Sequence, residues 1–257
     1  MYDEPVIRPL KKSILFYLLL AHEAKIFPGL TYAQLYERIN HVAEASVRLA
    51  VIQLESEGFV ARLKTTQAIT FRLSSQGRSF LEAMYPSALF KPELRTTEPH
   101  VIILKKKSGL IKPPSWWGRL YPSVYVSMLP FAEHHAELIW LSFPVSSFSQ
   151  QDKKELIYQS FNLEKISKEY ANVSGKIERL LTKLILEKDS SHNVSQQYRS
   201  ITKKLLSVFQ LDPCIHEEYL PIGFAGSAVV RLMLQLEQVI CDIESHRDSA
   251  KSSVLKK

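Results

Sequence analysis

The stretch that most constrains the fold is residues 46–60, SVRLAVIQLESEGFV. Its apolar positions recur at intervals of three and four residues: Val47, Val51 and Leu54. This spacing is typical of a helix that buries one face, and a helix is expected from about Ala43 to Glu57. Gly58 is the residue type that most readily takes the left-handed conformation after a helix end. The stretch therefore predicts a helix that packs on a core and leads directly into a sheet.

The elements predicted around this helix follow a definite order. They are a buried helix over residues 10–25, a second helix over 32–40, the helix just described, strands over 59–64 and 68–73, and a helix from Ser74 or Ser75 to Tyr85. Pro9 suits the start of the first helix, and Thr31 is an N-cap residue type before the second. Three helices, a hairpin and one more helix is the order of a winged helix-turn-helix domain, which we predict over residues 1–86.

The rest of the chain predicts two further parts, so that the fold class is α+β multidomain. Three prolines between residues 86 and 99 indicate a linker. Strands are expected in VIILKKK, SVYVSML and AELIWLSFPV, with a Pro- and Trp-rich connection between the first two, which predicts a small α+β domain over residues 99–150. A helical domain is expected over residues 151–250, with one helix from Gln151 to about residue 188, another from Gln197 to Gln210 and a last one from Ser227 to His246.

Composition narrows the classes of function. The 257 residues carry 33 Lys and Arg against 26 Asp and Glu, a net charge of +7 that favours a polyanionic partner. Cys214 and Cys241 have no C-x-x-C spacing, which predicts a reducing, cytoplasmic setting and no zinc site. The longest apolar run, residues 13–21, is about half of the ~20 residues that a membrane span needs, so no membrane partner is expected. We find no nucleotide-binding or hydrolase motif, and we predict a non-enzyme without cofactor or metal.

Separated stretches of the chain resemble the PaaX family of bacterial transcriptional repressors, which control phenylacetate degradation. RPLKKSILFYLLLAHE, EASVRLAVIQLESEGFV and FRLSSQGRSFLEAMY are similar to the family's N-terminal domain, and YPSVYVSMLP to a strand of its middle domain. FNLEKISKEY and LDPCIHEEYLPIGFAG are the specific part of the match, and the order of all these stretches is that of the family. The resemblance spans almost the whole chain and implies a winged helix, a ferredoxin-like middle domain and a helical C-terminal domain. The middle domain is shortened here, because SGLIKPPSWWGRL replaces the helix that the family has between its first two strands.

The resemblance also implies a dimeric repressor that binds double-stranded DNA and is released by an aryl-acyl-CoA effector. This chain departs from the family where Phe224 and Ala225 replace a Trp-Pro pair. Nothing in the residues themselves points to the acyl-CoA. The sequence GFAGSA is most simply the start of the last helix. If the protein senses a small anion, this helix start is where it would bind, so the candidate effector region is Phe224, Gly226 and Ser227.

If Val47, Val51 and Leu54 face the core, the opposite face of their helix is available to a DNA groove. Arg48 is predicted to contact guanine or phosphate, and the alternatives are a solvated arginine or a pair with Glu44. Glu44 could accept from cytosine, although an acid near phosphates more often costs affinity. Leu49 and Ile52 fit contacts to thymine methyl groups, a protein contact or a shifted helix register. Ser46 and Gln53 complete this predicted surface.

The remaining predicted contacts go to phosphate, which positions a protein without reading sequence. These residues are Thr31, Tyr32, Arg62, Lys64, Thr65, Thr66, Gln67 and Arg72. So few basic groups predict that one copy of the protein binds DNA with modest affinity. Two copies bound to a palindromic operator would raise the overall affinity. We therefore predict a dimeric, DNA-binding transcriptional regulator, most simply a repressor; the alternative is a protein-interaction module that does not read DNA.

Two other clusters are interpreted as structural. Lys105, Lys106 and Lys107 with Trp116 and Trp117 combine charge with aromatic rings, as single-strand binding surfaces do, but a strand end beside core tryptophans is the simpler interpretation. His134 and His135 are neighbours without a third ligand at helical spacing, which indicates surface histidines.

Overall fold

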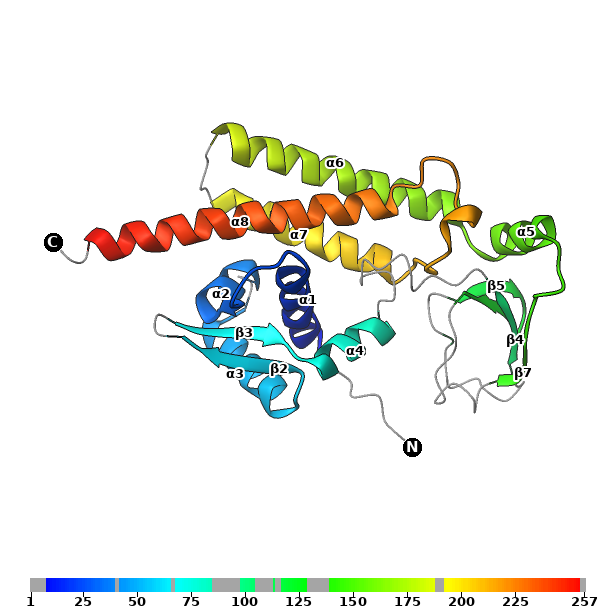
Figure 1. Cartoon of the computed structure of the whole chain (residues 1–257), viewed down its shortest axis with the longest axis horizontal. Coiled ribbons are helices and arrows are strands. Elements are labelled where there is room, and N and C mark those ends of the chain that lie inside the picture. The colour runs from blue at the N-terminus through cyan, green and yellow to red at the C-terminus, as the bar shows by residue number, and fades with distance from the viewer. Residues whose placement is uncertain are drawn as a thin grey trace. The chain divides into compact units, whose positions relative to one another are not determined.

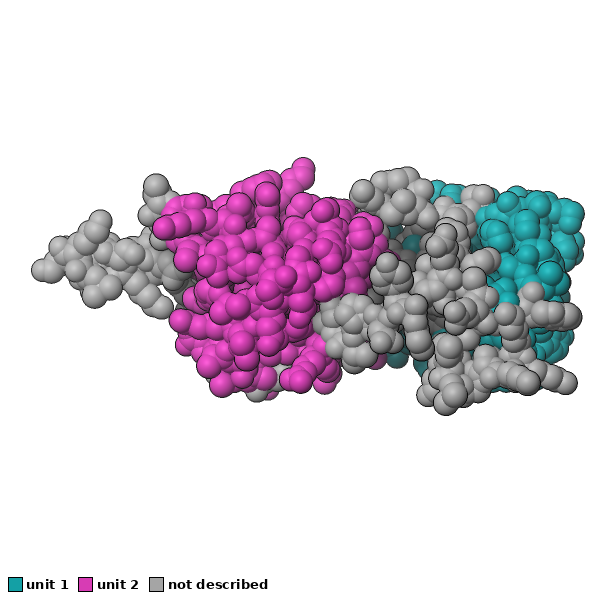
Figure 2. Space-filling view, turned by 90° about the horizontal axis from the view of Figure 1, so that it is seen from below, with its two compact units in different colours: residues 1–2, 84–171, 205–227 teal, residues 3–83, 172–204, 228–257 magenta. Residues whose placement is uncertain are grey.

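The computed structural model describes residues 8–39, 42–65, 68–84, 98–104, 113, 117–128, 139–187 and 192–254. Over these residues the chain forms eight α-helices, a short 3₁₀ helix and two small antiparallel sheets, so it is a mixed α+β protein as predicted (Figure 1). The chain divides into two compact units, each assembled from separate stretches (Figure 2). Unit 1 contains residues 1–2, 84–171 and 205–227, and unit 2 contains residues 3–83, 172–204 and 228–257.

Helix α1 (Pro9–Glu23) lies in the core of unit 2. Every residue from Ile14 to Ala21 is buried, which confirms the predicted buried helix, and Pro9 begins it as expected. A helix that is apolar on all sides must be covered on all sides. The cover comes from α2 (Tyr32–Ile39), α3 (Glu44–Ser56) and β3 (Ile69–Leu73), which contact α1 (Figure 1).

The ends of α2 and α3 are set by local hydrogen bonds. The Thr31 hydroxyl accepts from the Gln34 amide at 3.2 Å, and the Gln34 side chain accepts from the Thr31 amide at 2.9 Å, a reciprocal capping box that confirms Thr31 as N-cap. At the end of α3, Gly58 has φ of +80°, and the amides of Gly58 and Phe59 donate to the carbonyls of Glu55 and Leu54. This arrangement is a Schellman motif, and the predicted left-handed glycine is confirmed.

The sheet of unit 2 has the order β1-β3-β2. The predicted hairpin is present as β2 (Val60–Lys64) and β3, and Ser74 caps the following helix α4 (Ser75–Met84) by accepting from the Gly77 amide at 3.0 Å. Strand β1 (Leu30–Thr31) was not predicted, because two residues carry no periodicity. Its pairing with β3 depends on a close approach at Gly29, where a Cβ would lie 2.3 Å from the Phe71 carbonyl oxygen.

The sheet of unit 1 has the order β5-β6-β4-β7, with all neighbours antiparallel. Three of its strands are those predicted: β4 (His100–Leu104), β6 (Val124–Ser127) and β7 (Ile139–Pro144). The fourth, β5 (Gly118–Tyr121), lies where we expected only a connection, and that expectation was wrong. Its four residues begin with glycine and end before proline, so the pairing with β6 stabilises a strand that its own sequence does not indicate.

The remaining described elements are helical: α5 (Gln150–Ser160), α6 (Leu163–Glu187), α7 (His192–Phe209), the short 3₁₀ helix η4 (Glu217–Tyr219) and α8 (Gly226–Val254). The single helix predicted from Gln151 is broken at Asn162, whose side chain accepts from the Lys165 amide at 3.1 Å and so caps α6. Helix α8 continues beyond the predicted His246, through a polar stretch without Gly or Pro. Helices α6, α7 and α8 each contribute residues to both units.

Candidate nucleic-acid interface

Helix α3 separates a buried face from an exposed one. Val47, Ala50, Val51 and Leu54 are buried, so the predicted apolar stripe is confirmed. The residues that we assigned to the outward face are all exposed: Glu44, Ser46, Arg48, Leu49, Ile52 and Gln53. The structure therefore leaves one side of α3 open to solvent along its whole length.

Arg48 lies over the start of α2. Its Nη2 is 2.8 Å from Oε1 of Glu44, and its guanidinium is 5.7 Å from the centre of the Tyr32 ring. Both side chains of the ion pair are more than half exposed, and such an i,i+4 pair is worth only about 0.3–0.5 kcal/mol. The pair that we considered as an alternative role of Arg48 is thus present, yet it holds the guanidinium too weakly to prevent an exchange for a stronger partner.

Leu49 and Ile52 are the unusual part of this surface. They are 56% and 48% exposed and lie three residues apart on the helix. A shifted register that would bury them does not occur. A contact to thymine methyl groups and a contact to another protein are the two explanations that remain.

The hairpin β2–β3 presents its basic residues on two faces. Paired residues of an antiparallel ladder point to the same face, and Arg62 pairs with Phe71 whereas Arg72 pairs with Ala61. Arg62 and Lys64 therefore share one face, and Arg72 lies on the other. Arg62 also forms an ion pair with Glu55 at 2.9 Å, which joins the hairpin to α3.

The turn of the hairpin is closed by Thr65. Its hydroxyl accepts from the Ala68 amide at 3.0 Å, and its own amide donates to the Ala68 carbonyl at 3.0 Å. Thr66 and Gln67, which we predicted as phosphate contacts, lie outside the described residues.

The two predicted contacts at the start of α2 differ in their availability. The Thr31 hydroxyl and amide are engaged with Gln34 in the capping box. Tyr32 packs edge-on against Phe71 with ring centres 4.4 Å apart, and within the described part of the chain its hydroxyl has no hydrogen-bond partner. Tyr32 is therefore the better placed of the two for a phosphate.

The predicted effector region is part of a packed cluster in unit 1. The Phe224 ring lies edge-on to Tyr170 at 5.5 Å, and a Cβ on the buried Gly226 would lie 2.7 Å from Phe224. Tyr170 donates to the buried Asp212 at 2.5 Å, which in turn accepts from the Cys214 amide. Ser227, in contrast, is exposed. Phe224 and Gly226 thus close the start of α8 by packing, and they join residues 161–170 to residues 211–226.

A buried charge cluster that we did not predict lies in unit 2. Arg38 of α2 donates to Glu237 and to Glu244 of α8, at 3.0 Å in each case, and to the Cys241 sulfur at 3.0 Å. Tyr198 of α7 also donates to Glu237, and burial raises the Tyr198 pKa well above its ordinary value, which keeps the phenol protonated. The sequence does contain a signal for the burial of Arg38, because this residue lies three positions after Leu35, on the face of α2 that is predicted to be buried.

The other clusters that we considered give less evidence of a functional site. Trp117 is buried against Ile102 and Leu104, in agreement with the core interpretation, whereas the basic run, Trp116 and the two histidines lie outside the described residues.

Among the residues that the structure describes, no group of three or more His, Cys, Asp or Glu could hold a metal ion. In the same part of the chain, none of the helices has the length and hydropathy that a membrane crossing requires.

Comparison with known proteins is informative for the fold alone. No protein-family model and no curated protein matches the chain. A solved structure, the uncharacterized protein Rv0674 from Mycobacterium tuberculosis, is similar with a TM-score of 0.53 and 14% identity, over 94% of this chain and 98% of that chain. The mixed α+β architecture of this protein is therefore similar to that of Rv0674 over almost its whole length.

Proposed function

We propose that this protein is a cytoplasmic, DNA-binding transcriptional regulator and not an enzyme, and that it acts as a dimer, most simply a repressor on a palindromic operator. The observation that carries the proposal is the exposed face of α3, tied to the basic hairpin β2–β3 through the Arg62–Glu55 ion pair at 2.9 Å. A helix-turn-helix protein places its second helix in the major groove, and the basic residues beside it contact the backbone.

The arrangement of elements supports this proposal. Three helices, a hairpin completed by a short strand and a fourth helix follow the order of a winged helix, with β2–β3 as the wing. The strand order β5-β6-β4-β7 is compatible with a shortened ferredoxin-like unit, since no helix lies between these strands among the residues that the structure describes. These two parts, together with the helical C-terminal part, are the ones that the PaaX resemblance implies.

Individual residues have roles that follow from their position. Arg48 would exchange Glu44 for guanine O6 and N7, and such a bidentate contact is worth about 1–3 kcal/mol of discrimination. Leu49 and Ile52 would contact thymine methyl groups, and Tyr32 and Lys64 would contact phosphate. With so few contacts in each copy, the C-terminal helices would have to pair two copies for tight binding.

Selection from random duplexes, followed by fluorescence anisotropy over a salt series, tests the proposal. Arg48→Ala is expected to weaken binding to the selected duplex by roughly 5–150-fold, the equivalent of 1–3 kcal/mol. Arg119→Ala, which removes an exposed arginine from β5 in unit 1, is the matched control and is expected to leave affinity unchanged. No enrichment in the selection, or equal effects of the two variants, would overturn the proposal.

The exposed pair Leu49 and Ile52 favours a second candidate, a winged-helix module that binds another protein. The double variant Arg48→Ala with Lys64→Ala separates the two functions. It should abolish binding of the selected duplex if the protein is a regulator, and it should leave partner binding intact if the protein is an interaction module.

A further inference from the structure

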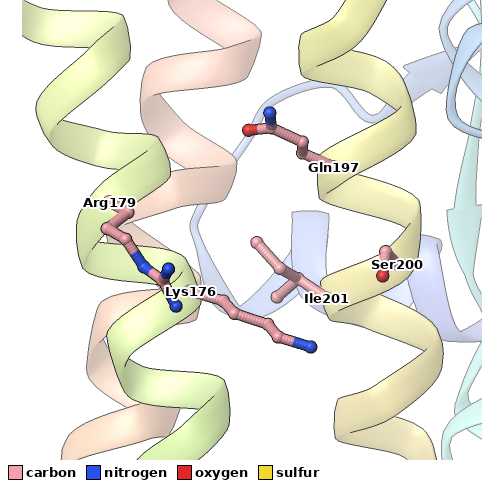
Figure 3. A pocket seen from close by; sticks show the side chains of 5 residues that line it. All are labelled: Lys176, Arg179, Gln197, Ser200 and Ile201. Carbon is pink, nitrogen blue, oxygen red and sulfur yellow. The ribbon is translucent and has the colours of Figure 1, made fainter.

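A cavity of about 330 Å³ lies between α6 and α7 in unit 2. It is lined by Lys176, Arg179, Gln197, Ser200 and Ile201. In Figure 3, Lys176 of α6 and the side chains of Gln197 and Ile201 of α7 point toward one another across the space between the helices. The volume is near the lower limit of ligand sites, about 300 Å³, which indicates a small ligand.

The lining is selective for negative charge. Among the described residues, it contains two cations and no carboxylate. Arg179 donates through Nε to the Gly175 carbonyl at 2.8 Å, which orients the guanidinium, and within the described residues its terminal nitrogens and the Lys176 ammonium have no partner. Gln197 and Ser200 add an amide and a hydroxyl from the other helix, and the nearly fully buried Ile201 supplies an apolar wall.

We infer that this cavity binds a small organic anion, with its phosphate or carboxylate group between Lys176 and Arg179 and a short apolar part against Ile201. An oriented guanidinium, an ammonium and neutral donors on a facing element are the groups that recognise such a headgroup. Because α3 lies on the far side of α7 and α8 from α6 within unit 2 (Figure 1), this site is separate from the proposed DNA surface.

The same segment of α7 that lines the cavity also contacts the N-terminal helices. Tyr198 stacks on Tyr17 of α1 with ring centres 5.8 Å apart, and it donates to Glu237, which also accepts from Arg38 of α2. Arg199 donates to the Ile39 carbonyl at the end of α2, at 3.2 Å. Gln197, Ser200 and Ile201 face the ligand. An anion that shifts α7 would therefore shift α2, and if α2 and α3 bind DNA as proposed above, the two sites are linked.

Isothermal titration calorimetry of the full chain without DNA tests the site independently of DNA binding. The titrants are inorganic phosphate and acetate, each at an ionic strength matched with sodium chloride, so that the two headgroup classes are distinguished. We expect saturable binding of at least one of them. Lys176→Gln with Arg179→Gln should weaken it by at least about tenfold, since charged hydrogen bonds are lost.

Lys165→Gln with Lys168→Gln is the matched control, because it removes two exposed cations at the same spacing from the same helix. It is expected to leave the binding unchanged. An equal loss in both double variants would identify general screening and would overturn the site. The absence of saturable binding of either anion would overturn it as well.

The linkage is measured by repeating the anisotropy titration with and without the bound anion, again at matched ionic strength. A change in DNA affinity that disappears in Lys176→Gln with Arg179→Gln supports the linkage. In Arg199→Gln, anion binding should persist while its effect on DNA affinity falls. An unchanged DNA affinity, or the same change in all variants, overturns the linkage. A protein that binds the anion but no DNA would contradict the proposed function and not the site.

Discussion

Nη2 of Arg38 in α2 lies 3.0 Å from Oε1 of Glu237 in α8, and both side chains are buried. The two residues are 199 positions apart in the chain. Glu237 also accepts from Tyr198 of α7, so a single carboxylate connects three helices of unit 2. The C-terminal helices are thus bound to the N-terminal ones by a charged contact inside the protein, where a missing partner is costly.

Arg38→Met should lower the free energy of unfolding by about 3–5 kcal/mol, because it leaves the carboxylate of Glu237 buried without its cation. Urea denaturation measures this. Arg48→Met, which breaks an exposed pair of the same residue types, is the control and should cost about 0–1 kcal/mol. The double variant Arg38→Met with Glu237→Gln should lose less than Arg38→Met alone. Equal losses of unfolding free energy in Arg38→Met and Arg48→Met would show that the buried ion pair contributes no more to stability than the exposed one.

Glu244 should make stability depend on pH. Burial raises its pKa above the ordinary value of 4.5, and Arg38 offsets this only in part. The folded state therefore holds the proton more tightly than the unfolded state, and the contribution of Glu244 is fully present below pH of about 4.5 and is lost as pH rises through its folded pKa. As the pH rises from about 4.5 to the folded pKa of Glu244, the free energy of unfolding of the wild type should fall relative to that of Glu244→Gln. Urea denaturation of both proteins measures this difference. A difference that is flat, or that grows with pH, would contradict this assignment.

Cys241 should resist alkylation in the native protein. Burial raises the pKa of its thiol to about 12, so almost no thiolate is present at pH 8. In the Cys214→Ala variant, iodoacetamide should label Cys241 rapidly in urea and only slowly in native buffer, as followed by mass spectrometry. Rapid labelling without denaturant would show that this part of α8 opens readily.

Two helical glycines should respond to alanine with opposite signs. A Cβ at Gly77 of α4 would lie 2.1 Å from the Phe59 carbonyl oxygen, a backbone atom that cannot move aside, so Gly77→Ala should destabilise the protein. At Gly175 of α6 nothing lies within 4 Å, and alanine should stabilise by roughly 0.5–1 kcal/mol through helix propensity. Thermal unfolding of the two variants measures both effects. A stabilising Gly77→Ala would contradict the close approach of Phe59 to α4, and a destabilising Gly175→Ala would contradict the open surroundings of Gly175.

The two faces of the hairpin β2–β3 should differ in their effect on DNA binding. Lys64 shares its face with Arg62, which is paired to α3, whereas Arg72 lies on the opposite face. Lys64→Gln should reduce the slope of log affinity against log salt by about 1, as the loss of one phosphate contact does. We predicted Arg72 from the sequence as a phosphate contact as well, but because it lies on the face opposite Arg62, we expect Arg72→Gln to leave the slope unchanged. The reverse result would place the other face of the hairpin against DNA.

Local sequence pattern was sufficient to predict the N-terminal helices and the hairpin β2–β3, although not strand β1. The stripe of Val47, Val51 and Leu54, the left-handed Gly58 and the cap at Thr31 all depend on residues within one or two turns of each other, and all three are present in the structure. The exposure of Leu49 and Ile52 follows from the same periodicity. Whether that face reads DNA is a prediction that the periodicity motivates and that the experiments above test.

Other features depend on partners that are distant in the sequence. Strand β5 exists because β6 pairs with it, and the partner of Arg38 lies on a helix 199 residues later. The proposed anion site brings Lys176 and Arg179 of α6 together with residues of α7, although an ordinary amphipathic pattern describes each helix alone. Helical periodicity and caps are encoded by neighbours along the chain, whereas strand pairing, buried ion pairs and cavities form only when the packed core brings separate elements into contact.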